Sequence, residues 1–284
     1  MGRFSAMASP CELLVETHDP VLANHLTSVA FKETKRIEQK FSRYLPNNPM
    51  AKINHSQGKP VVIDDEIFRL LEFAKRCFEL SGGMFDITSG ALRKAWKFDG
   101  SDNLPAPDVV KELMPYIGWK KVEYDQISII LAKGMELDFG GIGKEYAVDC
   151  VAKLCDEYAP TTSVVVNFGG DIQVTRARQL KQPWHIGIES PEESDKSTTN
   201  ILKIISGGLA TSGDARRYLL KKGKRYSHIL NPETGYPIEN AARSVTVAAP
   251  HCIQAGLLAT LALLKGTQAE AFLEEQEVKY WCYR

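Results

Sequence analysis

The sequence predicts an α+β fold in which mostly antiparallel sheets are flanked by helices. Helical and strand patterns are mixed along the 284 residues, without the regular strand, helix, strand order of a doubly wound sheet. Turn residues join neighbouring strands at hairpin spacing, as antiparallel pairing requires. We expect a single domain over residues 1–284, with room for two closely packed lobes, because 44% hydrophobic residues suffice for a large core.

The N-terminal half carries clear start and stop signals for two helices. Asp19-Pro20 supplies an N-cap followed by proline at the first helical position, and apolar residues at helical spacing then extend to about Arg43. The second helix starts at Asp64-Asp65 and ends at 81–83, where two glycines suit a left-handed cap. The strands expected in this half lie at 11–17, at 122–131 as a hairpin turning at 125–126, and at 135–139.

The C-terminal half alternates buried strands with apolar helices. Val, Ile and aromatic residues mark the strands, and apolar residues at helical spacing mark the helices. Strands are expected at 163–167, 184–189, 201–205, 226–230 and 244–248. Helices are expected at 144–158, 253–265 and 267–276, with a helix-like segment at 215–222 and a polar loop at 190–200.

The composition excludes some classes of function. Lys+Arg and Asp+Glu are balanced at 35 each, so the chain has no overall field that would favour nucleic acid. The N-terminal residues lack the apolar centre of a signal peptide, and no segment approaches the length of a membrane span. We therefore expect a cytoplasmic protein with no membrane partner.

One segment mixes residue types that a packed core does not need. His228 ends an expected strand, just before the strong turn signals Asn231-Pro232 and Thr234-Gly235. Rigid loops of this kind often present working side chains, so His228 is a candidate proton acceptor. The alternative is that His228 only braces the loop.

Two glycine-rich turns are candidates for binding an anionic, aromatic ligand. The stretch from Asp138 to Lys144 joins a strand to a helix N-terminus, where backbone amides and the lysine favour phosphate. Met84, Phe85 and Asp86 would offer an apolar face and an acceptor to a planar heteroaromatic ring. The alternatives are a tight turn at the first site, and at the second a buried Phe beside an Asp that binds loop amides.

Taken in order, these segments resemble the ApbE-type FAD:protein FMN transferases from about residue 4 to 266. The opening Phe4-Ser-Ala-Met-Ala-Ser is similar to F-x-A-M-G-T, and Gly83-Met-Phe-Asp-Ile-Thr to G-x-F-D-x-T. Asp138 to Lys144 resembles D-L-G-G-I-A-K. Thr211-Ser-Gly-Asp with Tyr226-Ser-His-Ile-Leu-Asn-Pro-Glu-Thr-Gly resembles T-S-G-D followed by Y-S-H-I-x-D-P-x-T-G.

The resemblance implies an ApbE-like, T-fold-related fold that binds FAD as its substrate. It implies transfer of the FMN moiety to a Ser or Thr hydroxyl of an acceptor flavoprotein, with release of AMP and with Mg²⁺ on the pyrophosphate. The metal would be held at Gly141 and Thr260, with His228 as the catalytic residue. The residues implied around FAD are Met7, Tyr44, Met84, Phe85, Asp86, Asp138, Lys144 and Ile238.

The chain departs from this pattern at the expected metal site. Gly256 stands where the family has its metal-binding aspartate, and Glu145 stands where it usually has glycine. A hard cation prefers carboxylate oxygens. Either metal binding is weak or another carboxylate substitutes, for which Asp138, Asp171 and Asp214 are the candidates.

Two other functions remain open at this point. A metal-dependent FAD pyrophosphatase would use water in place of the acceptor hydroxyl. A non-catalytic FAD-binding protein would have kept the pocket and lost catalysis with the aspartate. The transferase is the leading hypothesis, because His228, Lys144 and the glycine turns all keep the family pattern.

Overall fold

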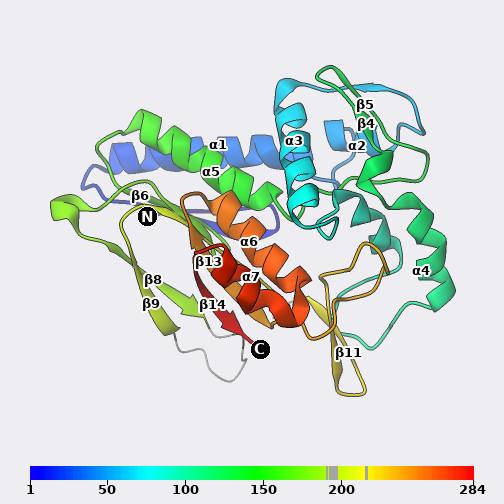
Figure 1. Ribbon diagram of the computed structural model, residues 1–284. Coiled ribbons are helices and arrows are strands. Elements are labelled where there is room, and N and C mark those ends of the chain that lie inside the picture. Colours follow the sequence, from blue (N-terminus) through cyan, green and yellow to red (C-terminus); the bar gives the residue numbers. More distant parts are fainter. Residues whose placement is uncertain (190, 192–197, 215–216) are drawn as a thin grey trace.

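A large antiparallel sheet forms the centre of the computed structural model, which describes residues 1–189, 191, 198–214 and 217–284 (Figure 1). Its seven strands follow the order β1-β2-β6-β7-β10-β13-β14, and each neighbouring pair is antiparallel. The strands are β1 (Gly2–Ala6), β2 (Ser9–Val15), β6 (Val164–Phe168), β7 (Asp171–Val174), β10 (Gly207–Gly213), β13 (Ser244–Ala249) and β14 (Lys279–Tyr283). The prediction of an α+β fold with mostly antiparallel sheets is confirmed.

Helices cover one face of this sheet and a β-hairpin covers the other. Val164 and Val166 of β6 join the main core beneath the helices, whereas Val165 packs with Leu202 and Ile204 on the opposite face. Period-2 alternation along the strand thus separates the two layers. The covering helices are α1 (Pro20–Phe41), α5 (Gly143–Tyr158), α6 (Cys252–Leu264) and α7 (Ala269–Glu275), and the hairpin consists of β8 (Trp184–Glu189) and β9 (Thr198–Ile204) (Figure 1).

A smaller group of elements lies beside the central sheet (Figure 1). Its helices are α2 (Pro49–Asn54), α3 (Asp65–Leu80) and α4 (Pro107–Leu113), and its 3₁₀ segments include η1 (Ile87–Lys94). A three-stranded sheet in the order β3-β5-β4 comprises Val61–Val62, Ser128–Ile130 and Glu123–Tyr124. The ribbon formed by β11 (Tyr218–Lys221) and β12 (Lys224–Ser227) completes the group, and its Leu219 is buried in a core with Leu92 and Trp96.

The predicted helix boundaries are confirmed by capping hydrogen bonds. The Asp19 carboxylate accepts from the Val21 N–H at the start of α1, and the Asp64 carboxylate accepts from the Ile67 N–H at the start of α3. Gly82 follows α3 with a φ of 64°, as a left-handed cap requires. Within the described ranges, no helix is both long enough and apolar enough to cross a membrane.

Two predicted elements are wrong, and the strand predicted at 226–230 is shifted to β12, which ends at Ser227. Residues 135–139 are not a strand, because their main chain bonds elsewhere: Leu137 pairs with the Asn54 side chain, and Asp138 donates to the Ile87 carbonyl. The segment expected as a helix at 215–222 contains strand β11, since it pairs with β12, while residues 215–216 lie outside the described residues. The polar loop expected at 190–200 also lies largely outside them, and 198–200 belong to β9.

Candidate functional site

The sequence Phe-Gly-Gly occurs at 139–141 and at 168–170, and the two turns meet at the N-terminus of α5. Lys144, in the first turn of this helix, places its Nζ 2.7 Å from Oδ2 of Asp171, which follows the second turn. Asp171 is 2% exposed, and its Oδ1 also accepts from the Thr211 N–H at 3.3 Å. Burial lowers the pKa of Lys144, but the neighbouring Asp171 outweighs this effect and raises it. The lysine is therefore charged at neutral pH and is held at the positive end of the helix dipole.

Next to this pair, α5 and α6 touch through Glu145 and Gly256. A Cβ built on Gly256 would lie 2.7 Å from Cγ and 3.0 Å from Oε1 of Glu145. Glu145 is 8% exposed, and its Oε2 is buried with no hydrogen-bond partner. Burial, followed by the nearby charge of Asp171, raises the pKa of Glu145 to about 8. A buried carboxyl group thus faces the position where the family pattern has aspartate.

The expected metal residues lie on neighbouring elements. Thr260, one helical turn after Gly256 in α6, places its Oγ1 2.9 Å from the Ser212 hydroxyl of β10. Gly141 is exposed in the loop before α5, where an added Cβ would touch the Phe85 ring at 3.3 Å. The structure therefore brings Gly141 to Phe85 and Thr260 to Ser212.

Asp138 is tied to an arginine that the sequence reading did not identify. Its Oδ2 lies 2.5 Å from Nη1 of Arg43, and its Oδ1 accepts from the Gly140 N–H. The same guanidinium donates to the Tyr44 hydroxyl and lies 5.0 Å from the centre of that ring. Tyr44 is 73% exposed, so its other ring face is free to stack on a planar ligand.

Asp86 braces its own turn. One of its oxygens accepts from the N–H and hydroxyl of Thr88, and the other accepts from the Trp119 N–H at 2.9 Å. Phe85 is buried against the main core and Met84 is half-buried at its margin. The alternative reading of an Asp that binds loop amides therefore describes Asp86, while the neighbouring Phe85 reaches the glycine loop.

Met7 and Ala8 form the two-residue turn between β1 and β2. Both have positive φ, 51° and 55°, the geometry of a type I′ hairpin. The Met7 N–H donates to Glu38 of α1 at 2.5 Å. Just after the turn, Ser9 would contact a Cβ on Gly169 at 2.8 Å, which places the hairpin end beside the second Phe-Gly-Gly turn.

His228 directly follows β12 and is half-buried. Its Nδ1 lies 3.2 Å from the Arg217 carbonyl oxygen, which only accepts, so Nδ1 carries the proton and Nε2 keeps its lone pair. Burial, followed by the positive charge of Arg217, lowers the pKa of His228. The ring is therefore neutral at neutral pH, the form that a proton acceptor needs.

The turn after His228 is well braced, as its Asn-Pro and Thr-Gly pairs predicted. The Trp96 Nε1–H donates to the Gly235 carbonyl at 2.8 Å, and Ile238 donates its N–H to Ile229. Ile238 is half-buried at the margin of the main core. The described contacts of His228 and Ile238 do not include Lys144 or Asp138, so these residues form two separate groups of contacts.

The structure adds residues that sequence reasoning missed or weighed differently. Arg43 and Arg217 were given no role, Glu145 was noted only as a departure from the family's glycine, and Ser212 only as part of the Thr-Ser-Gly-Asp motif. The repeated Phe-Gly-Gly sequence could have indicated Asp171 as the partner of Lys144, because each of these two residues follows one copy of it.

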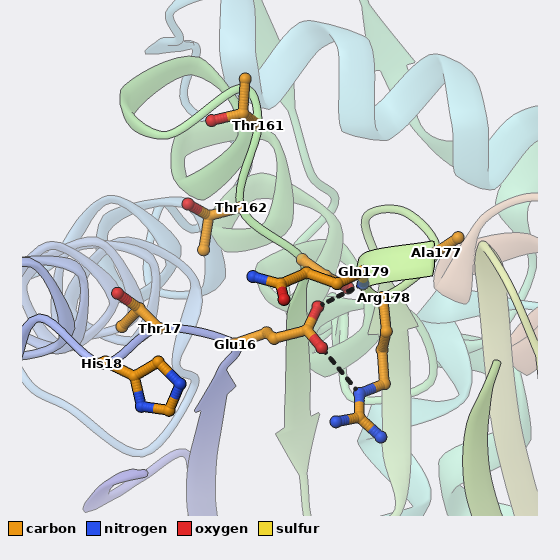
Figure 2. Close-up of a pocket in the computed structure, with 9 residues that line it drawn as sticks. Glu16, Thr17, His18, Thr161, Thr162, Ala177, Arg178 and Gln179 are labelled. Atoms are coloured by element: carbon orange, nitrogen blue, oxygen red, sulfur yellow. Dashed lines mark hydrogen bonds and ion pairs between the residues drawn. The ribbon is translucent and has the colours of Figure 1, made fainter. Parts of the chain in front are cut away.

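A separate polar cavity of about 320 Å³ is lined by residues 16–18, 161–163 and 177–179 (Figure 2). It is bounded by segments that follow β2 and β7 and precede β6, at the opposite ends of those strands from Lys144 and Asp171. Its Glu16 already pairs with Arg178 at 3.0 Å and accepts from the Gln179 N–H. With this carboxylate paired and no motif residue in its wall, the cavity is not the candidate site.

Comparison with known proteins identifies the family. The model of the ApbE family matches residues 7–282. FAD:protein FMN transferase of Klebsiella pneumoniae is 30% identical over 90% of this chain and 79% of its own length, and that of Chlamydia pneumoniae is 29% identical over 83% and 75%. The crystal structure of the ApbE protein from Thermotoga maritima superposes with a TM-score of 0.89 at 28% identity, covering 99% of this chain and 92% of that one. The chain belongs to the ApbE family.

Proposed function

We propose that this chain transfers the FMN moiety of FAD to a Ser or Thr hydroxyl of an acceptor flavoprotein, through a phosphoester bond, with release of AMP. The observation that carries the proposal is the loop from Asp138 to Lys144, which opens α5 with a charged lysine beside Asp171. Amides at a helix N-terminus together with a cation form a site for phosphate oxygens. The relatives named FAD:protein FMN transferase support the same reaction.

The FAD molecule would contact both groups of residues, with its pyrophosphate at the glycine loop. Exposed Tyr44 offers a ring face to the isoalloxazine, and Met7, Met84, Phe85 and Ile238 supply apolar contacts. Asp138 acts through Arg43, which it fixes against Tyr44. Asp86 shapes the turn that carries Phe85, because both of its oxygens are already bonded.

In the transfer, the acceptor oxygen bonds to the phosphorus of the FMN phosphate. The bond from this phosphorus to the bridging oxygen breaks, and its electron pair leaves with AMP. The hydroxyl proton moves to Nε2 of His228, which is free because Nδ1 donates to Arg217. Lys144 and the loop amides hold the phosphate oxygens in line, an electrostatic contribution that dominates phosphoryl transfer.

Magnesium fits the region around the glycine loop and the contact between α5 and α6. A hard cation prefers oxygen, and the region offers the Thr260 hydroxyl, the main chain at Gly141 and a buried carboxyl oxygen with no partner. When bound, the cation supplies neutralisation of charge on the pyrophosphate. The cytoplasmic location and the single domain expected from the sequence stay predictions.

The test is incubation of the purified chain with FAD, Mg²⁺ and a candidate acceptor flavoprotein, followed by intact-mass measurement of the acceptor. We expect a covalent FMN adduct and free AMP. AMP formed without an acceptor would instead identify a pyrophosphatase. Tight FAD binding without AMP or adduct, at any magnesium or manganese concentration, would identify a binding protein.

Replacing His228 by Ala should slow transfer about a hundred- to ten-thousand-fold while leaving FAD affinity nearly intact. His185→Ala is the matched control, because His185 is an exposed histidine of β8 on the hairpin that covers the other face of the sheet. A loss of FAD affinity in the His228 variant would assign that residue to binding and not to proton transfer.

A further inference from the structure

We propose that Glu145 is the carboxylate ligand of the divalent cation in this chain, supplied from α5 because α6 has glycine at position 256. The inference rests on the proposed function, in which a cation neutralises the pyrophosphate. It assigns the missing charged ligand to a residue that is not among the three carboxylates suggested by the sequence.

The contact between the two helices supports this assignment. The side chain of an aspartate begins at Cβ, and the Cβ position at Gly256 is 3.0 Å from Oε1 and 3.1 Å from Cδ of Glu145. The Glu145 carboxyl group therefore occupies the volume that an aspartate side chain at position 256 would enter. Gly256 and Thr260 are four residues apart and share a face of α6, so Glu145 meets the same face as the Thr260 hydroxyl.

The second observation is the unpartnered oxygen. Glu145 is more than nine-tenths buried, and its Oε2 has no hydrogen-bond partner. Leaving a buried carboxyl oxygen without a partner is unfavourable, because the group has lost its hydrogen bonds to water and gained none in the protein. A hard cation would satisfy this oxygen directly.

Each of the three carboxylates suggested by the sequence is already paired with a side-chain cation. The pairs are Asp138 with Arg43 at 2.5 Å, Asp171 with Lys144 at 2.7 Å, and Asp214 with Arg225 at 3.1 Å and Arg243 at 3.0 Å. Asp149, on the same helix as Glu145, accepts from the first two N–H groups of α6. Among these acidic residues, Glu145 alone keeps a carboxyl oxygen for a metal.

The remaining ligands would be neutral oxygens. Throughout the part of the chain that the structure describes, no three His, Cys, Asp or Glu side chains converge as a preformed metal cluster. One carboxylate with hydroxyl, main-chain and pyrophosphate oxygens is the kind of set that magnesium uses beside phosphates. Glu145 would then be the only charged protein ligand, and its removal should have a large effect.

The experiment measures Mn²⁺ binding by electron paramagnetic resonance, in the presence of FAD, for the wild type and four variants. Glu145→Gln keeps the shape of the side chain and should weaken Mn²⁺ binding about tenfold or more. Glu157→Gln, on an exposed part of the same helix, should leave it unchanged. Gly256→Asp alone should lower the melting temperature, because its Cβ would lie 2.7 Å from Glu145 Cγ.

The double variant Glu145→Gly with Gly256→Asp returns the carboxylate to α6 and should restore Mn²⁺ affinity to within a few-fold of wild type. Wild-type affinity in Glu145→Gln, or no binding in the wild type, would overturn the assignment. Failure of the proposed function would give a different result from failure of this assignment. Mn²⁺ binding would still depend on Glu145, but no acceptor would gain FMN.

Discussion

Removing the ammonium group of Lys144 should destabilise the protein in a manner that depends strongly on pH. Lys144→Met keeps an unbranched side chain but leaves Asp171, 2% exposed, with only the Thr211 N–H at 3.3 Å. Losing one partner of a buried ion pair costs about 3–5 kcal/mol. The loss in the free energy of unfolding has an upper limit, because Asp171 can become protonated and lose its charge.

The upper limit follows from the ordinary carboxyl pKa of 3.8. Each pH unit above that value adds about 1.36 kcal/mol to the free energy of protonating the group, so the loss cannot exceed about 4.4 kcal/mol at pH 7 or about 1.6 kcal/mol at pH 5. Burial raises the pKa of Asp171 above its ordinary value even beside Lys144, and removing the lysine raises it further. The free energy of unfolding should therefore fall more steeply in the variant than in the wild type as pH rises above about 3.8.

Urea unfolding at pH 7 and pH 5, followed by tryptophan fluorescence, measures both values. We expect a loss of about 3–4 kcal/mol at pH 7 and less than half of that at pH 5. Adding Asp171→Asn should recover most of the stability without recovering FAD binding. Lys153→Met is the control, because this exposed lysine of α5 contacts Glu157 only at 3.9 Å and should change stability by less than about 0.5 kcal/mol. A loss below 1 kcal/mol at pH 7, or the same loss at both pH values, would refute the reasoning.

Two further predictions concern the turn between β1 and β2 and the histidine. Ala8→Gly should raise the free energy of unfolding by about 0.5–1 kcal/mol in urea titrations, because an alanine in the left-handed conformation is strained. Ala6→Gly, in the adjoining strand, should lower the free energy of unfolding by a similar amount. The same effect in both variants would contradict the argument. The transfer rate should rise with pH through a His228 pKa below 6.5 and then level off. Arg217→Gln should move this limb to higher pH, since a positive charge is removed while the carbonyl acceptor remains; an unmoved limb would count against His228 as the titrating group.

Local signals in the sequence predicted the long helices and several strands, because those elements depend on local chemistry. Strands β1, β7, β10 and β14 of the central sheet were not predicted. The N-caps at Asp19 and Asp64 and the glycines after α3 are each set by a few adjacent residues, and each was placed correctly. Residues 135–139 look like a strand because they alternate, yet their bonding groups meet the Asn54 side chain. That partner is 83 residues away, and no local pattern reveals it.

The site was predictable as a set of motifs and not as a set of contacts. The glycine loop, His228 and the glycine at position 256 in place of the family's aspartate were visible in the sequence. The match to the ApbE family model confirms the resemblance. The partners could not be seen. Glu145 meets Gly256 only because α5 and α6 pack together on one face of the sheet, and Arg43 meets Asp138 across 95 residues of sequence.

The contact between Glu145 and Gly256 also limits how such a site could change during evolution. An aspartate at position 256 would force the Glu145 side chain to shift, and a glycine at position 145 by itself would leave the two helices without a carboxyl group at their contact. Each single substitution is unfavourable, whereas the two together move the carboxyl group from one helix to the other. Comparing sequences one position at a time would report a lost aspartate, whereas a carboxyl group is present on the neighbouring helix.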